Sequence, residues 1–162
     1  MLEVKNIVTE IETQEGTIKA VDDLTLSIAP REIYALVGES GCGKSMTALS
    51  LLRLLPETGL VSSGVVTVDG TEIMGLPESM MRRIRASKIS LIFQEPGLSL
   101  NPVMTIGDQI LETIYLHTSL RGQSAKNKVL DWLNKVGISE PEKRIDMFPH
   151  EISGGRSEEH TS

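Results

Sequence analysis

One run of residues has the composition and spacing of a phosphate-binding loop. Gly38-Glu39-Ser40-Gly41-Cys42-Gly43-Lys44-Ser45 fits the pattern G-x-x-x-x-G-K-[ST] and stands between an apolar run and a helical pattern, the context that the pattern requires. Its glycines let the backbone turn so that successive N–H groups converge on a β-phosphate. Lys44 would bring a full positive charge to the β- and γ-phosphates, and the Ser45 hydroxyl would ligate Mg²⁺. The simpler alternative is a glycine-rich connection with a solvated lysine.

The single cysteine of the chain lies inside this run. Cys42 occupies a position where the pattern accepts any residue, and no histidine lies nearby in the sequence, so we interpret it as a small filler rather than a nucleophile. One cysteine cannot close an internal disulfide or hold a cysteine-based metal cluster, which fits a reducing compartment. Any metal must therefore arrive with a ligand.

Two further segments could add to this chemistry. Gln94 closes an apolar run and is followed closely by Pro96, so its amide would sit at a strand end, where its oxygen could bind Mg²⁺ and orient a water. Ser153-Gly154-Gly155 would form a second anion site if a helix starts there. Taken alone, a turn glutamine and a common loop are the simpler interpretations.

Strands and helices of an α/β protein are expected around these motifs. Residues 4–11 and 24–28 predict antiparallel strands with one buried face, whereas the apolar runs 33–37 and 88–93 predict strands buried on both faces of a mostly parallel sheet. Residues 64–68, followed by Asp69-Gly70, predict a strand and a turn. Helices are expected over 45–55, 106–116 and 125–136, the first a buried helix ended by Pro56 and the last ended by Gly137.

The charge balance argues against a protein that binds its partners through a general positive field. The chain has 162 residues, with 16 Lys and Arg against 22 Asp and Glu, a net charge of −6 and a pI near 5.1. The cluster Arg82-Arg83-Ile84-Arg85 has no interleaved aromatic residues, so we interpret it as a solvated face and expect no nucleic-acid partner. The sequence shows neither an apolar stretch of the roughly 18 residues needed to cross a bilayer nor a signal-peptide pattern, so we expect a cytosolic protein.

Taken in order along the chain, three motifs resemble those of the ATP-binding subunit of ABC transporters. They are the loop at 38–45 (Walker A), the strand end at Gln94 (Q-loop) and Ile152-Ser153-Gly154-Gly155 (start of the signature motif). Phe93-Gln94-Glu95-Pro96, Ser99-Leu100-Asn101-Pro102-Val103-Met104-Thr105-Ile106 and Phe148-Pro149-His150-Glu151 are similar to the oligopeptide, dipeptide and nickel importer branch. The resemblance covers residues 1–155. It implies an α/β P-loop NTPase with a RecA-like core, an N-terminal antiparallel β subdomain and a helical subdomain over about residues 97–152, incomplete at the C-terminus.

The same resemblance implies ATP and Mg²⁺ as cofactors and assigns roles to individual residues. Lys44 and Gln94 would act in catalysis, and Ser45 and Gln94 would hold the metal. Ser153, Gly154 and Gly155 would contact the ATP of a partner subunit. The residues implied to contact the chain's own nucleotide are Ile18, Gly38, Glu39, Ser40, Gly41, Cys42, Gly43, Lys44, Ser45 and Met46.

The resemblance also implies partners and a location. Two ATP-binding subunits, identical or different, would sandwich two ATP molecules and drive two membrane-spanning permease subunits, with residues 99–109 near the membrane subunits. An extracytoplasmic solute-binding protein would take part indirectly. The chain would then lie peripherally on the cytoplasmic face of the inner or plasma membrane and couple ATP binding and hydrolysis to uptake of peptides or similar small solutes.

Two departures from the family pattern change these expectations. No aromatic residue occurs between Gln14 and Ile18, where family members often stack one on adenine, so contact with the base would rest on Ile18. After Gly155 the family would supply a strand with a Mg²⁺-binding Asp and a catalytic Glu, and later a switch His, none of which follows here. We therefore expect these residues to bind ATP without hydrolysing it, and to aggregate through unpaired strand edges at 33–37 and 91–93.

The last residues, 156–162, are polar where a half-buried helix should begin. Arg156-Ser157-Glu158-Glu159-His160-Thr161-Ser162 is what a sequencing-library adapter encodes when read as coding sequence, so we interpret it as a non-native tail on a truncated gene. A natural acidic tail is the alternative.

Two other classes of protein share part of this pattern. A soluble ABC-type ATPase of DNA repair or translation would carry the same motifs and would differ in having no membrane subunits. A soluble P-loop kinase would explain the phosphate loop, but neither the spacing of Gln94 nor Ser153-Gly154-Gly155.

Overall fold

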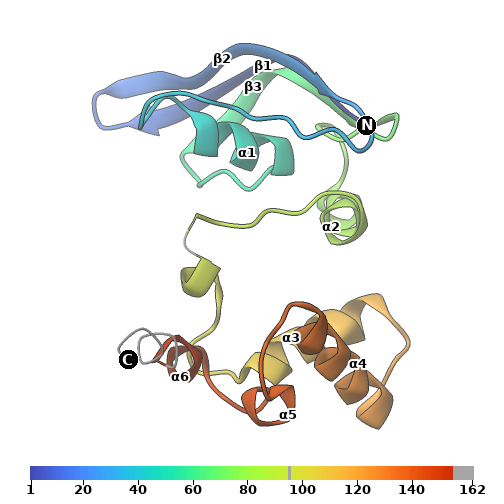
Figure 1. Ribbon diagram of the computed structural model, residues 1–162. Coiled ribbons are helices and arrows are strands. Elements are labelled where there is room, and N and C mark those ends of the chain that lie inside the picture. Colours follow the sequence, from blue (N-terminus) through green and yellow to red (C-terminus); the bar gives the residue numbers. More distant parts are fainter. Residues whose placement is uncertain (95, 155–162) are drawn as a thin grey trace. The chain divides into compact units, whose positions relative to one another are not determined.

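A computed structural model describes residues 1–94 and 96–154, and the chain divides into two units, Met1–Leu91 and a second that begins at Ile92 (Figure 1). The first unit holds β1 (Leu2–Thr13), β2 (Gly16–Ile28), α1 (Lys44–Leu52), β3 (Gly59–Val68), β4 (Thr71–Glu72) and α2 (Glu78–Ser87). The second holds the 3-10 turn η1 (Pro96–Ser99), α3 (Ile106–His117), α4 (Gly122–Lys135), α5 (Pro141–Arg144) and α6 (Pro149–Gly154). Among the described residues, every helix is too short or too polar to cross a bilayer.

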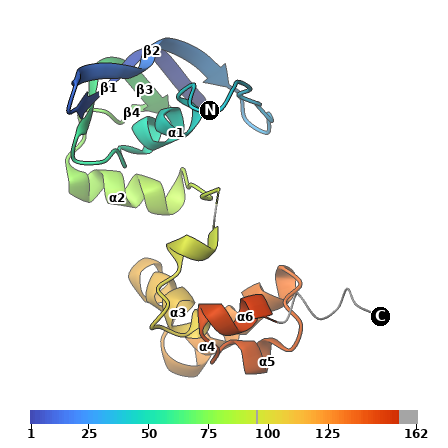
Figure 2. The same ribbon diagram turned by 90° about the vertical axis from the view of Figure 1, so that its left-hand side faces the viewer.

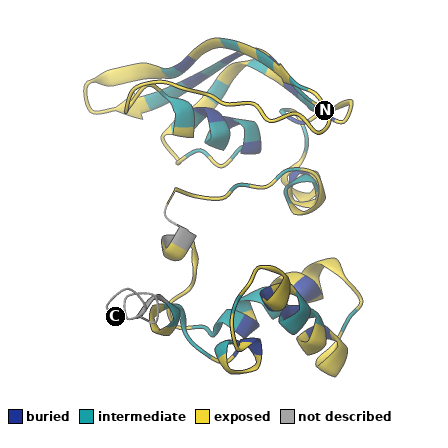
Figure 3. Cartoon of the chain, in the orientation of Figure 1, coloured by how far each residue is buried: buried dark blue, intermediate teal, exposed yellow. Residues whose placement is uncertain are grey.

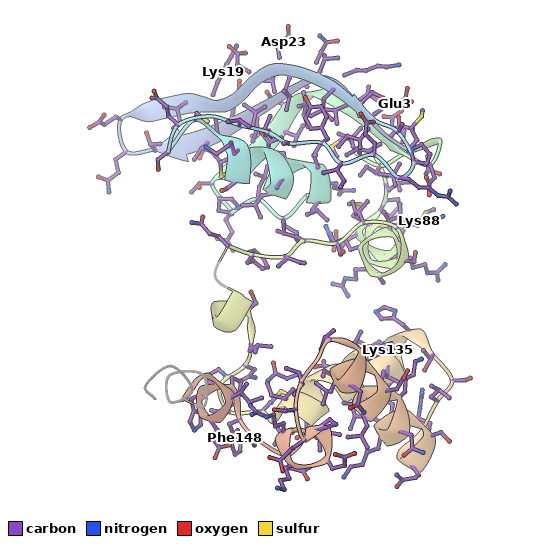
Figure 4. All side chains as sticks on the ribbon, viewed as in Figure 1. Glu3, Lys19, Asp23, Lys88, Lys135 and Phe148 are labelled. Carbon is purple, nitrogen blue, oxygen red and sulfur yellow. The ribbon has the colours of Figure 1, made fainter. Side chains whose placement is uncertain are left out.

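A four-stranded antiparallel sheet in the order β2-β1-β3-β4 forms the first unit, and α1 lies against one of its faces (Figure 1). Val4 and Ile7 of the central strand β1 lie in the buried core, where they pack with residues of β2 and β3. They are three residues apart, and a register shift between them lets both side chains face the core. Lys19 and Asp23 of β2 project from the opposite face (Figure 4). The strands expected within 4–11, 24–28 and 64–68, and the turn at 69–70, are confirmed.

Helix α1 begins at Lys44, one residue before its expected start, and ends at Leu52 rather than at residue 55. The reason is local: Arg53 adopts a left-handed conformation (φ 53°), and its N–H donates to the carbonyls of Leu49 and Ser50. The helix therefore ends before Pro56 is reached. It is only partly buried, because Ser45 is exposed whereas Thr47, Ser50 and Leu52 are buried.

A pair of buried hydroxyl groups joins α1 to the sheet. Thr9 Oγ1 and Ser50 Oγ lie 2.7 Å apart, and Ser50 Oγ donates to the carbonyl of Met46 at 2.6 Å. Because the single Ser50 hydrogen is used in that second bond, Thr9 must be the donor of the first. Both hydroxyl groups are thus satisfied without water.

The arginine cluster of α2 does more than form a solvated face. Arg82 and Arg83 are exposed, as expected, but Arg85 is only 17% exposed and reaches the end of α1. Its guanidinium donates to the carbonyl oxygens of Leu52 (2.8 Å) and Arg53 (3.1 Å) and pairs with Glu78 at 2.6 Å. These bonds satisfy carbonyls that the helix end leaves without intrahelical partners.

The second unit is helical, as its apolar periodicity predicts. Its core is formed by Ile114, Ala125, Val129, Leu133 and Ile145, which lie on α3, on α4 and next to α5 (Figure 2). The helices expected over 106–116 and 125–136 are confirmed, and Gly137 ends the second of them in a left-handed conformation.

The buried parallel strands expected at 33–37 and 88–93 are wrong for this structure. Residues 33–37 and 89–93 belong to no helix or strand, and Lys88 ends α2 with its N–H bonded to the Ile84 carbonyl. Most of both segments is exposed (Figure 3). Ile33, Val37 and Ile92 are 97%, 89% and 86% exposed. A strand needs a neighbour for its N–H and C=O groups, and the described sheet contains only β1 to β4. The apolar composition of these two segments favours burial, but it does not provide the neighbouring strand that a sheet requires.

The Thr9–Ser50 pair predicts a coupled effect on stability. Thr9→Val should lower the free energy of unfolding by about 1–2 kcal/mol, because a methyl group would face Ser50 Oγ at hydrogen-bond distance. Adding Ser50→Ala should cost less than the sum of the two single changes, as a double-mutant cycle by urea denaturation would measure. Additive losses would show that the two hydroxyl groups act independently.

Gly107 in α3 predicts a second stability effect, this time of steric origin. A Cβ at this position would lie 2.5 Å from Ile145 Cγ1 and 2.6 Å from the Ile145 carbonyl oxygen. Gly107→Ala should destabilise the helical unit by about 1–3 kcal/mol although alanine favours helices. Gly75→Ala, whose Cβ would meet nothing within 4 Å, is the control, and equal melting temperatures for the two variants would contradict the prediction.

Candidate nucleotide-binding site

The phosphate loop lies directly against the backbone of β2. Gly43, the residue before α1, has φ 92°, and a Cβ on it would lie 2.3 Å from the carbonyl oxygen of Ala20. Only glycine permits both this conformation and this approach. The contact fixes the start of α1, and with it the last turn of the loop, relative to the sheet.

Lys44 turns back over the loop. Its Nζ donates to the carbonyl oxygens of Gly38 (2.8 Å) and Glu39 (2.5 Å), and Cys42 Sγ lies 3.4 Å from the same nitrogen. The loop's own carbonyls therefore hold the ammonium group, close to the N-terminal end of α1 with its partial positive charge. The lysine and the helix end thus supply the positive field that an anion requires.

A pocket of about 220 Å³ opens beside Lys44. It is lined by Ala20, Val21, Asp22 and Leu24 of β2, by Leu36 and Val37, and by Cys42, Lys44 and Thr47. Asp22 brings a negative charge to this lining, but it pairs with Lys19 at 3.0 Å. That hydrogen bond raises the pKa of the Lys19 ammonium and offsets the charge of the carboxylate.

The residues that follow Lys44 have three different environments. Ser45 is exposed, so its hydroxyl is available to a ligand. Met46 is partly buried against the sheet core, which makes it a packing residue in this structure. Thr47 Oγ1 donates to the carbonyl of Gly43 at 3.0 Å and closes the first turn of α1.

A larger pocket, of about 430 Å³, lies between β3 and the C-terminal end of α1. Arg53 contributes to its lining, but the guanidinium donates to the carbonyls of Ile73 (3.2 Å) and Leu76 (2.6 Å). Size alone would favour this pocket, whereas Cys42 and Lys44 of the predicted phosphate loop line the smaller one.

The other residues expected at the site lie on β2, in the second unit and at the end of α6. Ile18 lies on β2 and is 54% exposed. Gln94 is exposed and belongs to the second unit, so its role toward Mg²⁺ and water stays a prediction. Ser153 and Gly154 form the end of α6, whereas Gly155 and the tail 156–162 lie outside the described residues.

Sequence reasoning named Ile18 but missed the contribution of the residues that follow it on β2. Ala20 receives the backbone of Gly43, and the residues that follow it line the pocket. No motif marks this part of the strand, because the residues act through backbone position and shape. Only the tertiary arrangement identifies them.

Relatives of known sequence match almost the whole of this chain. A Brucella abortus (strain 2308) protein named for peptide import is 45% identical over 156 residues, 96% of this chain and 47% of that protein. The oligopeptide transport ATP-binding protein OppD of Escherichia coli (strain K12) is 41% identical over 155 residues, 96% of this chain and 46% of OppD. The chain thus spans about half the length of the curated relatives it matches.

A solved structure shows the same fold. The bacterial ABC transporter cassette MJ0796, solved as a dimer, superposes with a TM-score of 0.81 at 23% sequence identity, over 96% of this chain and 65% of that one. This likeness confirms the expected fold class of an ATP-binding cassette. The ABC transporter family model matches residues 21–160. The chain therefore belongs to the ABC transporter family.

Proposed function

We propose that the chain is the nucleotide-binding part of an ATP-binding subunit of an importer for peptides or similar small solutes. The observation that carries this proposal is the phosphate loop, in which Gly43 packs on β2 and Lys44 is held over the loop at the start of α1. Relatives at 45% and 41% identity are named for peptide import and oligopeptide transport, which supports the substrate class.

The residues present fit ATP with Mg²⁺. The backbone of residues 38–43 would bind the phosphates together with Lys44, and Ser45, whose side chain is exposed, would supply a hydroxyl ligand to Mg²⁺. A residue with a Cβ would not fit at Gly43, where the backbone packs on the Ala20 carbonyl of β2, and this contact holds the loop in place at the start of α1. Bound Mg²⁺ would neutralise charge on the phosphate oxygens.

Contact with the base would be weak. Ile18 is half exposed on β2 and offers only apolar contact, since no aromatic residue occupies 14–18. Binding would therefore depend mainly on the phosphates, and other nucleoside triphosphates should compete with ATP.

The remaining roles belong to the assembled protein. Gln94 would orient Mg²⁺ and water, and Ser153, Gly154 and Gly155 would contact the ATP of a second ATP-binding subunit. At the cytoplasmic face of the membrane, ATP hydrolysis would drive two permease subunits. An extracytoplasmic solute-binding protein would deliver the solute. The dimer described for MJ0796 supports pairing of two cassettes.

Replacement of Lys44 tests the proposal directly. Lys44→Met removes the charge aimed at the phosphates and should raise the Kd for Mg-ATP by about 10- to 100-fold, measured by calorimetry. Lys5→Met, at an exposed lysine of β1, is the matched control and should leave the Kd unchanged. Equal affinities of wild type and Lys44→Met would refute the assignment of the loop.

Replacement of glycines in the loop separates backbone strain from steric contact. Gly41 and Gly43 both have positive φ, but a Cβ would meet nothing within 4 Å at Gly41 and the Ala20 carbonyl at Gly43. Gly43→Ala should therefore weaken ATP binding by about tenfold more than Gly41→Ala. If the two variants bind equally, the contact with β2 does not position the loop.

A further inference from the structure

The side-chain amide of Gln109, in the first turn of α3, is fully engaged with the segment that precedes the helix. Its Oε1 accepts from the N–H of Asn101 at 2.9 Å, and its Nε2 donates to the carbonyl of Asn101 at 3.0 Å. The same Nε2 lies 3.2 Å from the carbonyl oxygen of Met104 and 3.4 Å from that of Thr105. One amide therefore holds both ends of the segment 101–105 on α3.

The segment is also closed within itself. Asn101 Oδ1 accepts from the N–H of Val103 at 3.1 Å, and the Met104 N–H donates to the Asn101 carbonyl at 3.3 Å. Thr105 caps α3 by accepting from the N–H of Asp108 at 3.1 Å. Residues 101–105 thus form a rigid extension of the helix rather than a free loop.

The start of α3 is bonded in turn to the chain that leads into α6. The Ile106 N–H donates to the Met147 carbonyl at 2.9 Å, and the Gly107 N–H donates to the Ile145 carbonyl at 2.8 Å. Helix α6 follows within a few residues and carries Ser153. A continuous series of hydrogen bonds therefore joins residues 101–105 to α3, and α3 to residues 145–147, which directly precede the helix that carries the predicted signature serine.

The chain before this rigid part is different. Residues 90–94 belong to no helix or strand, and Ile92 is 86% exposed. The boundary between the two units also falls here, between Leu91 and Ile92. Such a stretch can absorb changes in backbone angles, as a hinge does.

From this juxtaposition we propose that Gln109 is a positioning residue, whose amide makes residues 101–105 move with α3 and α6 when Gln94 is displaced. The inference rests on the proposed function, in which Gln94 responds to bound Mg-ATP. Without the amide, the segment would absorb the displacement, and α6 would not respond to the nucleotide.

Gln109→Glu isolates this role because it keeps the shape of the side chain. One oxygen of the carboxylate still accepts from the Asn101 N–H. The other oxygen replaces the Nε2 donor, so it would face three carbonyl oxygens to which it cannot donate. Gln123→Glu is the matched control, since that amide bonds the exposed side chain of Asn127 on α4.

The experiment is hydrogen exchange of the full chain with and without Mg-ATP. In wild type and in Gln123→Glu, Mg-ATP should protect the phosphate loop and change exchange in α3 and residues 145–152. In Gln109→Glu the protection of the loop should remain, whereas the change in α3 and residues 145–152 should fall by about fivefold or more. A purely structural role would alter exchange equally with and without nucleotide.

The outcomes separate the two proposals. If wild type shows no protection of the phosphate loop, the proposed function fails and this inference fails with it. If the loop is protected but α3 and residues 145–152 respond in Gln109→Glu as in wild type, or respond in neither, only the inference is overturned. If Gln109→Glu unfolds, Gln109→Met takes its place, because methionine lacks both polar atoms and adds no charge. The response of α3 and residues 145–152 to Mg-ATP then decides in the same way.

Discussion

The approach of the phosphate loop to β2 is the constraint on which the first unit depends. Because the Gly43 backbone lies against the Ala20 carbonyl, the first residue of α1 has one available place relative to the sheet. The Thr9–Ser50 pair holds the middle of the helix and Arg85 holds its end. With three fixed points along a helix of nine residues, the direction of its axis is determined, and Lys44 is placed with it.

Arginine is suited to the role it has at the end of α1. A guanidinium carries donors in a planar fork, so Arg85 can bond the carbonyls of Leu52 and Arg53 and pair with Glu78 at the same time. Arg53 repeats the arrangement with the carbonyls of Ile73 and Leu76. The polar ends of consecutive elements are thus joined by side chains, which lets a short helix remain in place without a long apolar face.

Sequence reasoning was reliable where local chemistry determines structure. The sequence patterns at 4–11 and 24–28 predicted β1 and the last part of β2, and the Asp69-Gly70 pair predicted the turn. The glycine pattern predicted the loop before α1. It failed at residues 33–37 and 88–93. A strand forms only when two segments pair, and the composition of one segment does not identify its partner. The contact at Ala20 and the bonds of Gln109 were equally out of reach, since they join residues through tertiary geometry that no spacing rule encodes.

The buried hydroxyl pair also has an evolutionary consequence. Removing one hydroxyl leaves the other facing an apolar group, whereas replacing both with apolar groups of suitable shape is close to neutral. Selection should therefore act on Thr9 and Ser50 as one unit, although 41 residues separate them in the sequence. Among homologous chains, a change at one of these positions should be accompanied by a compensating change at the other, so that covariation records a contact which neither position reveals alone.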